Sequence, residues 1–329
     1  MMRNTQAALG GILSSRRWIN ILGEQGFVVI FVLWLLFLTF TTRSFATLDN
    51  VSTVLRQAAI IAIVAIGEHF IVLLGTMDVS LPSILTVGGV FTGALMVNAH
   101  VPALPAVLCV LALGGLLGLA NGAIVTRLKI NPIITTLGMM YILSGIAFVY
   151  TKGRTIYGDA LAPMDFLARG KLLGISAPIL IMFVLYVIFH LVLRYTRFGA
   201  RVFAAGNNEK ASWLAGIKTS RVKQNVFMLA GVLAAFAGFM QVARQGSASA
   251  SMGDDFLFPV LTAVVLGGTS LSGGKGKIFN TLIASIFLMT IKNGMILLDL
   301  SIYIQKIIQG AILILALSLD RLRTAKGAS

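Results

Sequence analysis

The sequence predicts an all-α fold, a polytopic membrane helix bundle of about ten transmembrane helices with both termini in the cytoplasm. Of the 329 residues, 57% are hydrophobic and 11% are charged, against about 45–50% and about 25% in ordinary globular domains. Apolar stretches long enough to cross about 30 Å of hydrocarbon recur along the chain. Lysine and arginine gather in alternate loops, as positively charged cytoplasmic loops do.

The expected spans follow from these stretches. They cover residues 26–42, 58–75, 82–98, 103–125, 132–150, 177–193, 226–243, 259–271, 278–298 and 303–319. The stretch 259–271 is short and ends in glycine-rich sequence, so a re-entrant or broken segment is an alternative there. Residues 1–25 are then a cytoplasmic tail, 26–320 the transmembrane domain and 321–329 a second cytoplasmic tail.

The charge distribution agrees with this arrangement of spans across the membrane. The net charge is +15, and with the N-terminus inside, most of the 26 basic residues fall in cytoplasmic segments. A basic group at 152–171 lies outside and runs against the bias. No basic cluster is interleaved with aromatic residues as in nucleic-acid-binding domains. Cys109 is the only cysteine, which excludes an intrachain disulfide.

Residues for catalysis are scarce. The three histidines are far apart and lack neighbouring ligands at metal spacing. The glycine-rich stretch 267–277 lacks the Ser or Thr that follows the lysine of a phosphate-binding loop. We therefore expect no enzyme activity, no metal and no ATP site in this chain.

Polar residues inside apolar spans are costly and often line a pathway. The candidates for a translocation pathway or gate are Glu68, Asp78, Ser80, Asn121, Thr135, Thr136 and Lys292. The stretch 75–80 breaks the second span, and either a gate or an ordinary loop with Asp78 capping the next helix explains it. The small residues around Asn121 favour close helix packing. Lys292 requires a counter-ion or a wet cavity, and Asp299 is a possible partner.

Three stretches between spans are long or polar enough to stand out. Asp254 and Asp255 lie at a predicted outer helix mouth, where either an external partner or solvent would meet them. The loop 194–224 is the most polar stretch of the chain and includes a short amphipathic segment. The outer loop 151–176 mixes charged and aromatic residues and is long enough for a short helix.

Four segments in order resemble the permease subunits of bacterial ABC importers for monosaccharides, the ribose-type branch of the branched-chain amino acid and sugar permease superfamily. They are GTMDVS at 75–80, KINPIITTLG at 129–138, TRFGARVFAAGNNEKASWLAGI at 196–217 and AVVLGGTSLSGGKG at 263–276. Met77 and Pro82 depart from the usual pattern. The resemblance extends from about residue 27 to residue 320.

This resemblance implies a permease that translocates a monosaccharide delivered by a periplasmic binding protein, in the bacterial inner membrane. A cytoplasmic ATPase subunit would hold ATP and Mg, and a second permease subunit would complete a homo- or heterodimer. The implied ATPase-coupling residues are Gly206, Asn207, Asn208, Glu209, Lys210, Trp213, Leu214 and Gly216. They would form a coupling helix at about 208–214, with contact charges at Glu209 and Lys210.

In the same scheme Trp213 and Leu214 are apolar anchors, Gly206 and Gly216 are flexible ends, and Asp254 and Asp255 meet the binding protein. An ion-coupled secondary transporter is the alternative, with Glu68 and Asp78 as its carboxylates. That alternative leaves the basic cytoplasmic loop without a role. The span residues do not discriminate among sugars.

Overall fold

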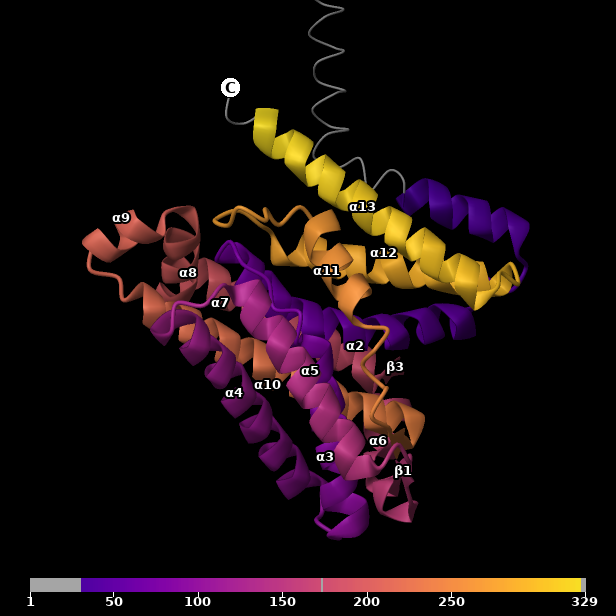
Figure 1. The fold of residues 1–329 in the computed structure, drawn as a ribbon. Helices are drawn as coiled ribbons and strands as arrows, with labels where there is room; N and C mark the ends of the chain where they lie inside the picture. Colours follow the sequence, from indigo (N-terminus) through magenta and orange to yellow (C-terminus); the bar gives the residue numbers. More distant parts are fainter. Residues whose placement is uncertain (1–30, 173, 327–329) are drawn as a thin grey trace, which may run out of the picture.

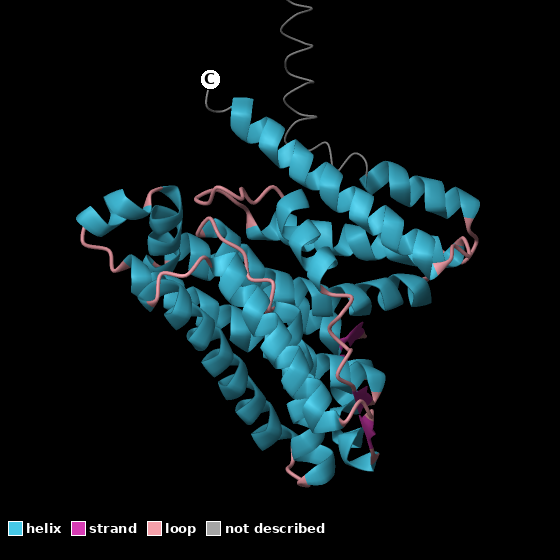
Figure 2. Ribbon diagram, in the orientation of Figure 1, coloured by secondary structure: helices cyan, strands magenta, loops and turns pink. Residues whose placement is uncertain are grey.

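The computed structural model describes residues 31–172 and 174–326, and these are mostly helical, with almost no sheet (Figures 1 and 2). The predicted N-terminal tail and the start of the first predicted span lie outside the described residues. The start of the predicted C-terminal tail, up to Lys326, continues the last helix, α13 (Ile302–Lys326).

Seven helices among the described residues are long and apolar enough to cross a membrane. They are α2 (Leu48–Leu73), α3 (Leu81–Gly93) with its π-helical end η1 (Ala94–Asn98), α4 (Ala103–Arg127), α5 (Pro132–Thr151), α7 (Ala177–Tyr195), α10 (Thr219–Gln245) and α12 (Ile278–Leu297). Each overlaps a predicted span, although α2 and α10 begin ten and seven residues before the predicted starts at 58 and 226. Three shorter apolar helices match the remaining three, Phe31–Thr41, α11 (Leu257–Leu266) and Ile302–Ser318 within α13. The all-helical membrane bundle is confirmed, and the count of ten spans stays a prediction.

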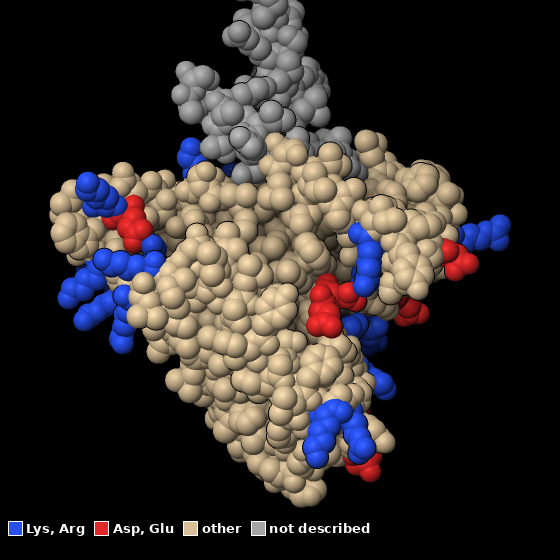
Figure 3. Space-filling model, viewed as in Figure 1, with Lys and Arg blue, Asp and Glu red and all other residues tan. Residues whose placement is uncertain are grey.

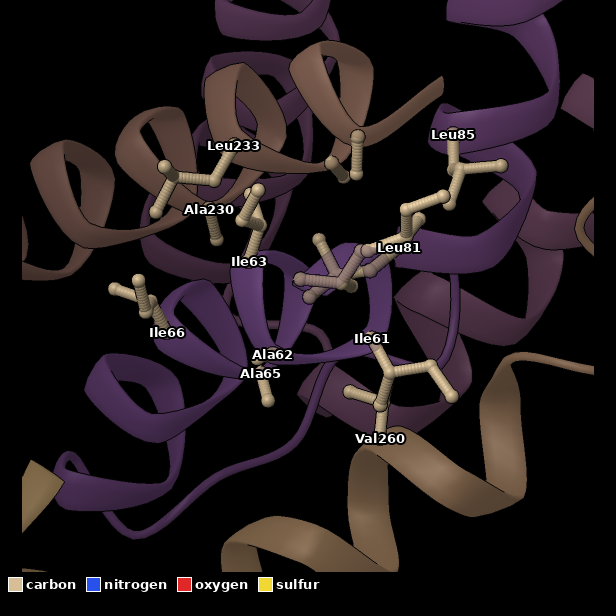
Figure 4. Packing of buried hydrophobic residues seen from close by; sticks show 14 of the residues in the cluster. Ile61, Ala62, Ile63, Ala65, Ile66, Leu81, Leu85, Ala230, Leu233 and Val260 are labelled. Atoms are coloured by element: carbon tan, nitrogen blue, oxygen red, sulfur yellow. The ribbon is translucent and has the colours of Figure 1, made fainter. Parts of the chain in front are cut away.

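Helices α2 and α10 form the centre of the bundle. In their most apolar windows 83% and 78% of residues are buried, against 22–33% in α4, α5 and α7. Figure 4 shows Ile61, Ile63 and Ile66 of α2 directed toward different neighbours, among them Leu233 of α10 and Val260 of α11. A helix that is apolar on all sides is suited to such a position. The apolar outer faces of α4, α5 and α7 are then available to lipid or to another subunit.

Small residues bring α4 and α10 into close contact. A Cβ added at Gly118 would collide with the carbonyl of Phe227, and one added at Gly231 would collide with the carbonyl of Gly114. The two backbones therefore touch, as small residues at four-residue spacing allow. The predicted packing role of the small residues around Asn121 is confirmed.

The stretch 259–271, where a re-entrant or broken segment was the alternative to a full span, has the short α11 as its only helix. After α10 and the two-residue strand β4 (Ser247–Ala248) the chain runs through turns to α11. Met252 packs against Gly89 and Gly253 against Pro82, so these turns lie along α3. Helix α11 has ten residues, about 15 Å, which is half of the hydrocarbon thickness. Non-helical backbone is tolerated at such depth when protein covers it.

Contacts between loops support the predicted sidedness. The outer loop contains β1 (Ile156–Tyr157), η2 (Asp159–Met164), α6 (Asp165–Arg169), β2 (Lys171–Leu172) and β3 (Ile175–Ser176). Strand β1 pairs with β4, so two segments predicted to lie outside meet. Helices α8 (Arg197–Asn207) and α9 (Glu209–Leu214) form the predicted cytoplasmic loop. Its Asn207 touches Gly274, so two segments predicted to lie inside also meet.

Candidate functional site

A buried polar cluster forms around the break between α2 and α3. The backbone N–H of Asp78 donates to both carboxylate oxygens of Glu68 at 3.3 Å. Ser80 donates to Asp78 Oδ1 twice, from its backbone N at 2.8 Å and from Oγ at 2.6 Å. The Asp78 carboxylate thus holds Ser80, the N-cap residue of α3, but no side chain caps this helix, so Asp78 does not cap it as the loop interpretation expected.

Two further helices join this cluster. Asn121 of α4 donates from Nδ2 to Ser80 Oγ at 2.8 Å and to Asp78 Oδ2 at 3.2 Å. The backbone N–H of Val79 donates to Thr136 Oγ1 of α5 at 3.2 Å. The side chains of Glu68, Asp78, Asn121 and Thr136 are at most 1% exposed. We name Glu68, Asp78, Ser80, Asn121 and Thr136 the break cluster.

The break cluster is closed to solvent, and within it Asn121 Oδ1 is buried without a hydrogen-bond partner in the described structure. Each contact found for it is a hydrogen bond to an amide, a hydroxyl or a carboxylate, and neither ion pair among the described residues involves it. Five of the seven predicted pathway residues therefore come together in one network. Thr135 is also buried, but its hydroxyl has no hydrogen-bond partner in the described structure.

Lys292 lies apart from the break cluster, in the wall of a polar pocket of about 310 Å³. The pocket is formed by α2, α10, the turns before α11, and α12. Its polar walls include Gln57, Gln241, Arg244, Ser251, Asp255 and Lys292. A polar cavity of the kind that the sequence required for Lys292 is present. No ion pair between Lys292 and Asp299 occurs among the described residues.

The acidic pair before α11 is exposed, and its location at an outer helix mouth stays a prediction. Asp255 lines the pocket and lies 3.8 Å from Lys306 of α13. The preceding Gly253 contacts Pro82, at the start of α3 and about 16 Å along that helix from Gly93. Figure 3 shows acidic and basic side chains together on this side of the molecule. The contact of Asp254 and Asp255 with a binding protein stays a prediction.

The predicted coupling helix is present as α9. Asn208 caps it, with Oδ1 accepting from the N–H of Ala211 at 2.9 Å. Trp213 and Leu214 are 65% and 71% exposed, which suits apolar anchors for a partner. Glu209 is bound to Lys223 of α10 at 2.7 Å, and Lys210 is exposed. Figure 3 shows basic side chains gathered at this end of the molecule.

Gly206 has a different role from the flexible end that was expected. It lies inside α8, where a Cβ would collide with the carbonyl oxygen of Leu73 and come within 2.8 Å of Gly274 N. That carbonyl accepts a hydrogen bond from Gly274 N at 2.8 Å. Gly206 is therefore a close-packing residue, whereas Gly216 has open space around it and a left-handed φ of +85°.

The same contact includes the break in α2. A Cβ at Gly273 would lie 2.7 Å from Gly206 O and 2.8 Å from Gly75 N. Gly273 and Gly274 have φ of +83° and +71°, which side chains disfavour. We name the contact of Leu73, Gly75, Gly206, Gly273 and Gly274 the glycine joint. It connects the helix before α9 to the segment that carries Asp78.

Sequence reasoning missed the role of His69. Its Nδ1 lies 2.9 Å from Thr269 Oγ1 and 3.0 Å from Thr281 Oγ1, and all three side chains are fully buried. The histidine thus links α2 to the glycine-rich turn and to α12. A buried polar residue beside Glu68 was the available signal, but its partners are about 200 residues away in the chain.

Residues 50–317 match the family described as branched-chain amino acid transport system / permease component. The chain belongs to this permease family. The permease is 34% identical to the ribose import permease protein RbsC of Escherichia coli (strain K12), over 96% of this chain and 98% of that protein. It is 37% identical to the ribose import permease protein RbsC of Bacillus subtilis (strain 168), over 91% and 92% of the two chains.

The L-arabinose ABC transporter permease protein AraH of Azospirillum brasilense is 34% identical to it, over 92% of this chain and 89% of that protein. No solved structure matches this permease with significant similarity. Family membership and the apolar helices make it a multi-pass membrane component of a transport system and not an enzyme. The resemblance found in the four sequence segments is confirmed.

Proposed function

We propose that this permease is the transmembrane subunit of an ABC importer that translocates a monosaccharide. The observation that carries the proposal is similarity along almost the whole chain to import permeases whose names specify ribose and L-arabinose. The exposed α9, with its two apolar side chains at a basic end of the bundle, supports it. An ion-coupled transporter would have no use for such a helix.

The proposed partners follow from this function. An ATPase subunit that holds ATP and Mg docks on α9 in the cytoplasm, and a periplasmic binding protein delivers the sugar at the opposite face. A second permease subunit, identical or related, completes the pathway in the bacterial inner membrane. The full proposed topology has ten spans and both termini in the cytoplasm.

The glycine joint supports a route for the energy of ATP hydrolysis. Closure of the ATPase pair would displace α9 and with it α8, whose Gly206 touches Leu73 at the end of α2. Since Leu73 and Asp78 flank the break, displacement at the joint reaches the break cluster directly. The bundle would then alternate between outward-open and inward-open states as the cluster rearranges.

Uptake by reconstituted vesicles tests the proposal. The permease is co-expressed with the ATPase and binding protein encoded beside it, and entry of labelled D-ribose, L-arabinose and D-allose is measured. We expect uptake of at least one sugar that requires internal ATP and the binding protein. Uptake driven by a proton or sodium gradient without ATP hydrolysis would show that the ion-coupled alternative is correct.

A further inference from the structure

The polar pocket around Lys292 has the composition of a sugar-binding site. Gln57, Gln241 and Ser251 present amide and hydroxyl groups, which donate and accept hydrogen bonds as sugar hydroxyls do. Phe256 and Pro259 form an apolar part of the wall, suited to the C–H face of a sugar ring. A volume of about 310 Å³ lies at the lower end of the range for small-molecule pockets.

A hydrogen bond holds Arg244 of the pocket in place. Gln241 is 2% exposed, and its Oε1 accepts from Arg244 Nε at 3.2 Å. The remaining nitrogens of that guanidinium are available as donors in a fixed fork. Lys292 adds an ammonium group from α12, and Asp255 adds an acceptor from the turns before α11. Donors and acceptors thus face one space from three sides.

The position of the pocket relates it to the break cluster. Ile61 of the pocket wall precedes Glu68 by two turns of α2, about 10 Å. The pocket is open and polar, while the break cluster beyond it is closed and fully buried. A sugar in the pocket would therefore sit outside the residues that must rearrange before it passes.

We propose that this pocket holds the monosaccharide during import, on the outer side of the closed break cluster. Gln57, Arg244 and Lys292 donate to sugar hydroxyls, Asp255 accepts, and Phe256 contacts the ring face. This inference rests on the proposed function and adds to it a residue-level site within the permease. Net attraction is weak because the walls are wet, so the site holds the sugar briefly and releases it.

Protection of an introduced cysteine tests the site in the reconstituted complex. Cys109→Ser removes the native thiol, and Ser251→Cys then places a thiol in the pocket wall. Ser301→Cys, exposed between α12 and α13, is the matched control outside the pocket. The probe is whichever of D-ribose, L-arabinose and D-allose is taken up, and the reaction is labelling by a small thiosulfonate reagent.

We expect the transported sugar to slow labelling at Ser251→Cys about threefold at twice its dissociation constant, and to leave Ser301→Cys unaffected. Adding Gln57→Leu or Lys292→Met should raise the half-protecting concentration about tenfold. Lys171→Met, in the outer loop, should not change it.

The outcomes separate the two proposals. In one outcome, a sugar is taken up in an ATP-dependent manner but protects neither cysteine, or both equally. This outcome overturns the pocket assignment and leaves the proposed importer function standing. Protection that Gln57→Leu and Lys292→Met do not weaken also overturns it. Absence of uptake for all three sugars, with the complex assembled and hydrolysing ATP, overturns monosaccharide import and with it the pocket.

Discussion

Two adjacent threonines on α5 differ in the hydrogen bonding of their hydroxyl groups. Thr136 accepts a hydrogen bond from the backbone of Val79 at 3.2 Å, whereas the buried hydroxyl of Thr135 has no partner in the described structure. Valine has nearly the same shape as threonine, so replacing either threonine by valine removes little besides the hydroxyl group. Thr135→Val therefore serves as the control for Thr136→Val.

We expect Thr136→Val to destabilise the permease by about 1–3 kcal/mol, because it leaves a buried N–H without an acceptor. Thr135→Val should be neutral or stabilising, since it removes an unpartnered polar group. Denaturation temperature in a mild detergent measures both. Equal effects of the two exchanges would contradict the hydrogen bonding described for the break.

The sequence predicted which residues belong to the break cluster but not how they pair. Glu68, Asp78 and Asn121 were found because polar groups in apolar spans are costly. Their partners depend on how α2, α4 and α5 rotate about their axes, and apolar composition does not determine this rotation. The same limit left Thr135 and Thr136 indistinguishable and concealed the two threonines that hold His69.

At the scale of elements, the glycine joint places α8, the end of α2 and the glycine-rich turn against one another. We expect Gly206→Ala to reduce sugar uptake severalfold while ATP hydrolysis continues, because the added methyl group displaces the Leu73 carbonyl from Gly274 N. Gly274→Ala, whose methyl group meets Asn207, should act alike.

The control for the joint is Gly138→Ala on α5, where a Cβ meets nothing within 4 Å. The three variants are compared by the number of sugars imported per ATP hydrolysed. A normal ratio in both joint variants would refute transmission through this contact.

The ion pair between Glu209 and Lys223 allows docking to be distinguished from folding of α9. Glu209→Lys breaks the pair at 2.7 Å and reverses a proposed contact charge. Adding Lys223→Glu restores an ion pair but not the original charge on α9. We expect the single and double variants to lose most of their coupled uptake, because the ATPase still meets the wrong charge.

Co-purification of the ATPase subunit provides the direct measurement for this pair of variants. Recovery of uptake and of co-purification in the double variant would mean that Glu209 serves only to tether α9 to α10. Such an ion pair between partly exposed groups is worth about 0–1 kcal/mol, so loss of the tether alone is a mild change.

Elements with a long sequence pattern were predicted, whereas elements of only two residues were not. Seven helices overlap their predicted spans because apolar length is a local property, and α9 lies in the range that the family resemblance implied. The pairing of β1 with β4 involves two residues on each side, too few for any periodic pattern.

For the whole molecule, the main prediction is that its two loop-bearing ends face opposite compartments. With Cys109→Ser as background, a thiol at Lys171→Cys should react with a membrane-impermeant maleimide added to intact spheroplasts. A thiol at Lys218→Cys should react only after the membrane is opened. Both positions are exposed, so labelling of both from one side would refute the proposed topology.

The glycine joint also bears on how such permeases can be recombined. Replacing only residues 194–224 with the loop of a relative, to recruit another ATPase, would bring a new surface against Leu73 and Gly274. These three stretches are far apart in the chain, yet they share one contact without space for a methyl group. A working chimera must therefore exchange the loop, the α2 break and the glycine-rich turn as one unit.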